Sequence, residues 1–201
     1  MQQFLSALML SASSNLDTLT VAISYGMYKI KIPFISNLLI AIITTVGTFL
    51  SMEFGSLLEN LIPSYLTDMI GGLILVLIGA WFLKDALRDI MKNKKQSNNS
   101  EDVLLNDNLW ADKDNSGDIS IKETFSLALA LTINNLGVGI AASITGVSIF
   151  YSTLFTFIIT ILSVSCGTWI GKSMFGKLFG KYASIISSIL LIILGTYESF
   201  I

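Results

Sequence analysis

The residues Ser14-Asn15-Leu16-Asp17-Thr18-Leu19-Thr20-Val21 decide how the rest of the chain is interpreted. They lie in the middle of an apolar run, from Phe4 to Tyr28, that is long enough to cross a bilayer as one helix. A carboxylate halfway along such a run is costly in lipid, so intramembrane acids typically mark a path for ions or protons. Asp17 is therefore the first candidate ligand, and Asn15 supplies a second oxygen donor within one helical turn.

The composition is typical of a membrane protein. Of the 201 residues, 53% are hydrophobic and 13% are charged, against about 25% charged residues in a soluble domain. The formal net charge of −2 argues against a nucleic-acid partner. The sequence contains no histidine and one cysteine, Cys166, which excludes histidine ligands, an internal disulfide and a cysteine metal cluster. A bound metal would have to use oxygen ligands, and an intramembrane enzyme is not expected.

The apolar runs predict an all-α membrane protein. We place six transmembrane helices at residues 3–28, 33–57, 66–90, 124–148, 150–173 and 181–200. The polar segment between the third and fourth helices is too hydrophilic for lipid. This pattern divides the chain into a first three-helix repeat at 1–91, a linker at 92–123 and a second three-helix repeat at 124–201.

Lysine and arginine predict the orientation. They follow the first span, end the third and separate the fifth from the sixth: Lys29, Lys31, Lys84, Arg88, Lys92, Lys94, Lys95, Lys172, Lys177 and Lys181. Because such residues concentrate in cytoplasmic loops, we expect a multi-pass protein of the cell membrane with both termini outside and the 92–123 loop in the cytoplasm. Asp85 and its charged neighbours at the end of the third span are interpreted as a solvated helix face.

The two halves of the chain resemble each other. The stretch 17–22 aligns with 134–139, Gly47-Thr48-Phe49 aligns with Gly167-Thr168-Trp169, and Gly79-Ala80-Trp81 aligns with Gly195-Thr196-Tyr197. The aligned positions are 117, 120 and 116 residues apart, so the three matches are nearly in register. Since each half has three spans, the second half would be inverted, and a 3+3 inverted repeat with a site near the midplane is a transporter architecture.

A second candidate site lies in the polar linker. Residues 112–123 have the spacing of an EF-hand calcium loop, with Gly117 at the sharp turn. The candidate Ca²⁺ ligands are Asp112, Asp114, Ser116, Asp118, Ser120 and Glu123. The alternative is an acidic, flexible linker, because the sequence has no second EF-hand to pair with this loop.

The six spans, the repeat and the Asp-centred motif in the first and fourth spans resemble the MntP-type manganese efflux pumps of the LysE-like exporter superfamily. Within that group the chain is most similar to the YtaF-type sporulation membrane proteins of endospore-forming bacteria. In the pumps each motif reads roughly Ser-x-Asp-Ala-x-Ala-Val, and the two aspartates are thought to hold the cation. Here the first motif keeps Asp17, whereas the second has Asn134 at the matching position.

The resemblance implies a transporter of a divalent cation such as Mn²⁺, working between the two faces of the lipid bilayer. Asp17 would be the central ligand, able to exchange a proton for the ion, and Asn15, Asn134 and Asn135 would be neutral partners. The alternative for the two neighbouring asparagines is hydrogen bonding between helices. Because one carboxylate replaces two, a non-transporting sporulation membrane protein, whose loop binds a cation or a partner protein, is the alternative function. An exporter of small organic solutes is a third candidate, and no protein partner is identified.

Overall fold

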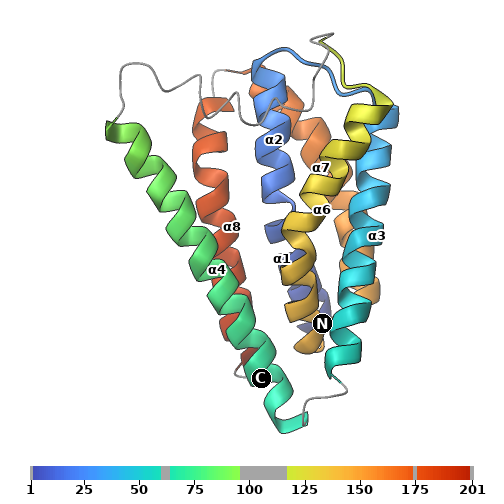
Figure 1. Cartoon of the computed structure of the whole chain (residues 1–201), viewed down its shortest axis with the longest axis vertical. Coiled ribbons are helices and arrows are strands. Elements are labelled where there is room, and N and C mark those ends of the chain that lie inside the picture. Colours follow the sequence, from blue (N-terminus) through green and yellow to red (C-terminus); the bar gives the residue numbers. More distant parts are fainter. Residues whose placement is uncertain (1, 60–63, 96–116, 174–175, 200–201) are drawn as a thin grey trace.

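The computed structural model describes residues 2–59, 64–95, 117–173 and 176–199 (Figure 1). Apart from one isolated β-bridge, the ordered elements in these ranges are helices, so the all-α prediction is confirmed for the described residues. The helices are α1 (Gln2–Ser14), α2 (Leu16–Met27), α3 (Phe34–Glu59), α4 (Ser64–Lys95), α6 (Ile121–Ile144), α7 (Ile149–Gly171) and α8 (Gly176–Ser199).

Several of these helices are long and apolar enough to cross a membrane. Within the described ranges they are α3, the Met69–Arg88 part of α4 and α7, and α6 is a fourth if its two bent parts count as one span. A shorter apolar stretch covers Ile185–Ser199 in α8. Large apolar side chains such as Phe34, Trp81 and Trp169 are exposed, as expected for helices that face lipid. The chain is therefore a multi-pass membrane protein, although the described helices meet the six-span expectation only in part.

Two of the expected spans are not straight. The span predicted at 3–28 is broken at Asn15, whose backbone angles of φ −98° and ψ 0° separate α1 from α2. The span predicted at 124–148 becomes α6, whose parts Ile121–Ile133 and Asn135–Ile144 are bent by 42°. Both irregularities fall on the Asn/Asp motifs that the sequence repeat had matched.

Most helix packing joins the first half of the chain to the second. α4 packs along α8, α3 packs along α6, and α7 packs against α1 and α2 (Figure 1). Glycines make these approaches close: a Cβ added at Gly171 would collide with the carbonyl oxygen of Ile23. Figure 1 also shows that the Lys95 end of α4 leans away from the other helices.

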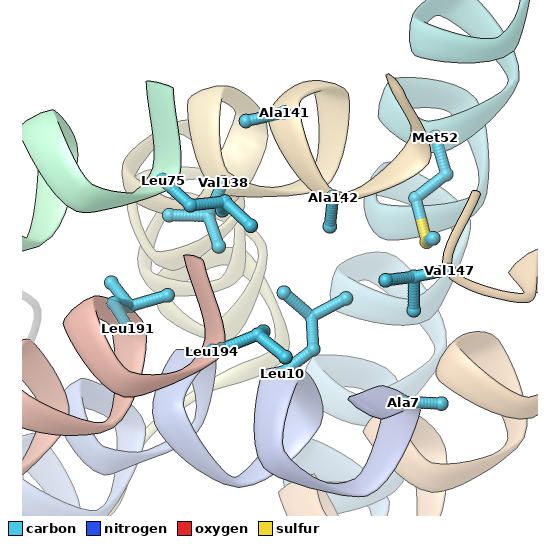
Figure 2. Close-up of a cluster of buried hydrophobic side chains, with 10 residues drawn as sticks. All are labelled: Ala7, Leu10, Met52, Leu75, Val138, Ala141, Ala142, Val147, Leu191 and Leu194. Atoms are coloured by element: carbon cyan, nitrogen blue, oxygen red, sulfur yellow. The ribbon is translucent and has the colours of Figure 1, made fainter. Parts of the chain in front are cut away.

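The hydrophobic core is shared by the two halves. Figure 2 shows one cluster gathered from α1, α3, α4, α6, α8 and the α6–α7 connection: Ala7, Leu10, Met52, Leu75, Val138, Ala141, Ala142, Val147, Leu191 and Leu194. A second cluster surrounds Tyr25 and Ile119. Because both clusters found among the described residues draw side chains from both halves, we expect the halves to fold together.

The segment before α6 is tied to the α2–α3 connection. The amide of Lys31 donates to the carbonyl of Gly117 at 2.9 Å, and the amide of Ile119 donates to the carbonyl of Lys31 at 3.0 Å. The Ser36 hydroxyl donates to the carbonyl of Ile119 at 3.1 Å, and the Ile119 side chain is fully buried. These contacts hold two connections at the same end of the molecule.

Candidate functional site

The break between α1 and α2 is fixed by the side chain of Asn15. Its Nδ2 donates to the carbonyl of Ser11 at 2.8 Å, and its Oδ1 accepts from the Thr160 hydroxyl of α7 at 2.6 Å. The side chain is only 3% exposed. Both the nitrogen and the oxygen of this side-chain amide thus have partners within the protein, as expected for a residue that positions the break. The role of Asn15 as a cation ligand stays a prediction.

The backbone carbonyls at the end of α1 are satisfied from two other helices. A helix end leaves carbonyls without intrahelical partners. Here Asn135 Nδ2 of α6 donates to the carbonyl of Ser14 at 3.0 Å, and Ser187 Oγ of α8 donates to the carbonyl of Ser13 at 2.9 Å. Ser13 Oγ returns a bond to the carbonyl of Ser187 at 3.0 Å. The end of α1 at the break is thus held by hydrogen bonds to a side chain of α6 and a side chain of α8.

Asp17 is the second residue of α2, immediately after the break. Its Oδ1 accepts a hydrogen bond of 2.7 Å from the backbone amide of Thr18. The N-terminal end of a helix carries a partial positive charge, which stabilises a carboxylate there. Broken helices in transporters place such ends inside the protein, at the substrate site. The position of Asp17 matches that arrangement.

A cavity of about 200 Å³ opens beside Asp17. α1, α2, α4, α6 and α8 supply its lining, which is Ser13, Ser14, Asp17, Phe82, Asp85, Ala86, Asn135, Val138, Ser187 and Leu191. Val138 and Leu191 belong to the cluster in Figure 2, so the hydrophobic core closes part of the wall. At about 30 Å³ per water molecule, such a volume accommodates a cation together with several waters. Carboxylate, amide and hydroxyl oxygens are the ligands that hard divalent cations prefer.

The cavity brings together some of the predicted site residues. It contains Asp17 and Asn135, whereas Asn15 does not line it. The side chain of Asn134 lies outside what the structure describes. The cavity also contains Asp85, which the sequence analysis had assigned to a solvated helix face. The signal that could have found Asp85 is its place inside the apolar Met69–Arg88 stretch, where a carboxylate is unusual.

The described residues of the predicted calcium loop do not form a metal-ligand cluster. Asp112, Asp114 and Ser116 lie outside them. Gly117 has the positive φ, 80°, expected at the sharp turn. Asp118 is exposed and bridges to Lys31. No group of three or more acidic, histidine or cysteine side chains suited to a metal occurs in the described ranges.

The two described ligands at the end of that loop have another explanation. Ser120 is the N-cap of α6, and Glu123 Oε2 accepts from its backbone amide at 2.9 Å and its hydroxyl at 2.7 Å. In return the Glu123 amide donates to Ser120 Oγ at 3.4 Å. This is a capping box, which satisfies free amides at a helix start. Ser120 and Glu123 are therefore accounted for without a bound Ca²⁺.

Comparisons with known proteins identify the family of the chain. A family model described as "Putative manganese efflux pump" matches residues 1–83 and 101–197. The "Probable sporulation protein YtaF" of Bacillus subtilis strain 168 is 34% identical over 208 residues, which cover 98% of this chain and 99% of that protein. The "Putative manganese efflux pump MntP" of Campylobacter hominis is 25% identical, covering 94% and 92%. Its namesake from Clostridium perfringens strain 13 is 29% identical, covering 61% and 58%. No solved structure matches the chain.

Proposed function

The chain belongs to the manganese efflux pump family, and from this premise we propose that it is a membrane transporter that exports a divalent cation, with Mn²⁺ as its cargo. The family is one of ion pumps and not of enzymes, and relatives carry manganese in their names. The observation that carries the proposal is the oxygen-lined cavity at the break between α1 and α2.

The chemistry of the cavity suits a transported ion. Asp17 supplies charge, Asn135 and the serines supply neutral oxygens, and waters complete the coordination of an ion such as Mn²⁺. Asn135 donates its side-chain nitrogen to the carbonyl of Ser14, and no described residue donates to its amide oxygen, which leaves that oxygen available as a ligand. A site that transports must bind strongly enough to capture the ion and weakly enough to release it. Protonation of Asp17 after release would remove the charge of Asp17 from the empty site.

We further propose that the helices form a six-span 3+3 inverted repeat, with repeats at 1–91 and 124–201. Pairs of equivalent glycine contacts support it. A Cβ on Gly79 would meet the carbonyl of Ser188 at 3.0 Å, and a Cβ on Gly195 would meet the carbonyl of Gly72 at 2.6 Å. Gly195 and Ser188 follow Gly79 and Gly72 by 116 residues, so each contact is the image of the other.

The same relationship holds between the other helices. A Cβ on Gly55 would collide with the carbonyl of Ile140, and one on Gly171 with the carbonyl of Ile23. The two glycines are 116 residues apart in the sequence, and the two isoleucines are 117 apart. Thr44 and Thr160, also 116 apart, approach each other at 3.4 Å between their hydroxyls, as a residue on a two-fold axis meets its own equivalent. For α3 and α7 these contacts favour an offset of 116 over the 120 suggested by Gly47 and Gly167.

For the orientation we propose both termini outside and the 92–123 linker in the cytoplasm. α1 begins and α8 ends at the lower end of Figure 1, whereas the α2–α3 connection lies at the upper end. The contact between Lys31 and Asp118 puts the end of the linker beside a basic connection. Both observations support a cytoplasmic upper end, because basic connections are enriched there.

The alternative function is a sporulation membrane protein that does not transport. Two observations favour it: the relative matched over 98% of this chain is named a sporulation protein, and Asn134 stands where the pumps have a second aspartate. In that case the fold would persist with a site too weakly charged to capture a divalent ion. The two functions differ in whether Mn²⁺ crosses the membrane.

The proposal can be tested in a bacterial strain that lacks its own manganese exporter. Expression of this protein should restore growth at high external Mn²⁺ and lower the manganese content of the cells. Asp17→Asn should lose both effects. Glu53→Gln, which removes an exposed carboxylate of α3 outside the cavity, is the matched control and should keep them. Equal protection by Asp17→Asn would remove Asp17 from the mechanism.

A further inference from the structure

We propose that Asp85 is the second carboxylate of the divalent-cation site, supplying from α4 the charge that the second motif lacks at Asn134. This inference rests on the transport function proposed above and identifies a further ligand for it. It concerns a residue outside the two ranges, 1–83 and 101–197, that the family model matches.

Geometry carries the inference. Phe82, Asp85 and Ala86 all line the cavity, and their spacing of three and four residues puts them on one face of α4. α2 and α6 contribute Asp17 and Asn135 to the same lining. The cavity thus receives oxygen donors from separate helices, and not from a row of acids along a single helix.

Asp85 has no recorded polar partner within the described part of the chain: it forms neither a hydrogen bond nor an ion pair there, although Lys84 and Arg88 are its neighbours in the sequence. It lies three residues before the Arg88 end of the apolar Met69–Arg88 stretch. Two carboxylates around one small cavity repel each other, and a divalent cation between them balances both charges.

Asp85 also makes the site asymmetric. Its equivalent 116 residues later is Ile201, so the second half has no matching acid. Asp85 is exposed, whereas Asp17 is partly buried beside the helix break. In the proposed orientation the Arg88 end of α4 faces the cytoplasm. Asp85 therefore stands at the cytoplasmic mouth of the cavity, where it would meet an outgoing ion before Asp17 does.

The test compares Mn²⁺ transport by full-length protein in sealed proteoliposomes, with rates measured over a range of Mn²⁺ concentrations. Asp85→Asn and Asp85→Ser both remove the charge, and Glu53→Gln is the control. We expect both Asp85 variants to raise the KM for Mn²⁺ by about tenfold or more, because affinity for hard cations depends on ligand charge. The control should keep the wild-type KM.

A rescue variant separates a ligand role from a structural one. In Asp85→Asn/Ala86→Asp the carboxylate moves to the next cavity-lining position of α4, where no side-chain hydrogen bond is lost. We expect this variant to recover most of the lost affinity, both in KM and in Mn²⁺ binding followed by the electron paramagnetic resonance signal of the free ion. A residue that merely stabilised α4 would not be replaced in this way.

The outcomes distinguish this inference from the proposed function. A wild-type KM in either correctly inserted Asp85 variant would overturn the role of Asp85 while leaving Asp17-dependent transport intact. If the wild-type protein shows no flux above empty vesicles, the transport function fails and the inference fails with it.

Discussion

The side-chain nitrogen of Asn135 lies 3.0 Å from the carbonyl oxygen of Ser14, to which it donates a hydrogen bond. Asn135 belongs to the second Asn/Asp motif and Ser14 ends α1 just before the first. The bond therefore joins the two motifs directly, and both Asn135 and Ser14 line the cavity beside Asp17. Two residues that are 121 positions apart in the sequence thus meet at one cavity.

Asn135→Ala should lower the stability of the protein, because it removes this hydrogen bond. It leaves the carbonyl of Ser14 without its partner, at a cost of about 1 kcal/mol. For a chain of this length that corresponds to a melting temperature lower by roughly 2–4 °C, measured on the detergent-purified protein. Thr196→Val is the control, because the exposed Thr196 bonds only to its own helix. An unchanged melting temperature in Asn135→Ala would show that the bond does not stabilise the break.

Asn15 and Thr160 should be coupled in stability and not in ion affinity. Their hydrogen bond of 2.6 Å is buried, and it holds the break between α1 and α2 in place. A double-mutant cycle with Asn15→Ala and Thr160→Val should give a coupling of about 0.5–1.5 kcal/mol in the free energy of unfolding. The KM for Mn²⁺ should change less than in the Asp85 variants. A large KM change in Asn15→Ala with unchanged stability would instead identify Asn15 as a ligand.

The proposed repeat predicts a matched response at equivalent glycines. Gly55→Ala and Gly171→Ala should each destabilise the protein by about 1–3 kcal/mol, because the new Cβ collides with a carbonyl of the facing helix. Gly137→Ala is the control, since its Cβ would meet only Ile78 at 3.7 Å. Thermal unfolding of the three variants checks this. If one of the two equivalent variants is tolerated and the other is not, the helix pairs are not equivalent.

Glu123→Ala tests the capping box against the calcium loop. Loss of the cap should lower stability by about 0.5–2 kcal/mol. Because the cap needs no metal, the loss should be the same with Ca²⁺ and with a chelator, as followed by melting temperature. A stabilisation of the wild type by Ca²⁺ that disappears in Glu123→Ala would revive the calcium site.

The sequence predicted the parts of the site that are encoded locally. Asp17 is recognisable because it interrupts an apolar run, and Asn135 because its motif repeats the first. The break at Asn15 was not predictable, since it depends on Thr160, a residue 145 positions away in another helix. Asp85 is exposed, as a solvated helix face predicts, but its place in the lining of the cavity depends on the packing of other helices against α4 and could not be predicted from the sequence.

The calcium interpretation illustrates a different difficulty. Positions 9 and 12 of an EF-hand loop are Ser120 and Glu123 here, and the same Ser-x-x-Glu spacing defines a capping box. Sequence spacing alone does not separate a helix cap from a metal ligand pair. In the structure Glu123 Oε2 accepts from the Ser120 hydroxyl, and the Glu123 backbone amide donates to Ser120 Oγ, so the cap alone accounts for both residues.

The most direct test of the account is Mn²⁺ flux into sealed proteoliposomes that contain the purified protein, compared with Asp17→Ala and with empty vesicles. We expect flux above the empty vesicles that saturates with Mn²⁺ and disappears in Asp17→Ala, while Glu53→Gln transports like the wild type. Folded, inserted protein that gives no flux above empty vesicles would contradict it and favour the non-transporting sporulation protein.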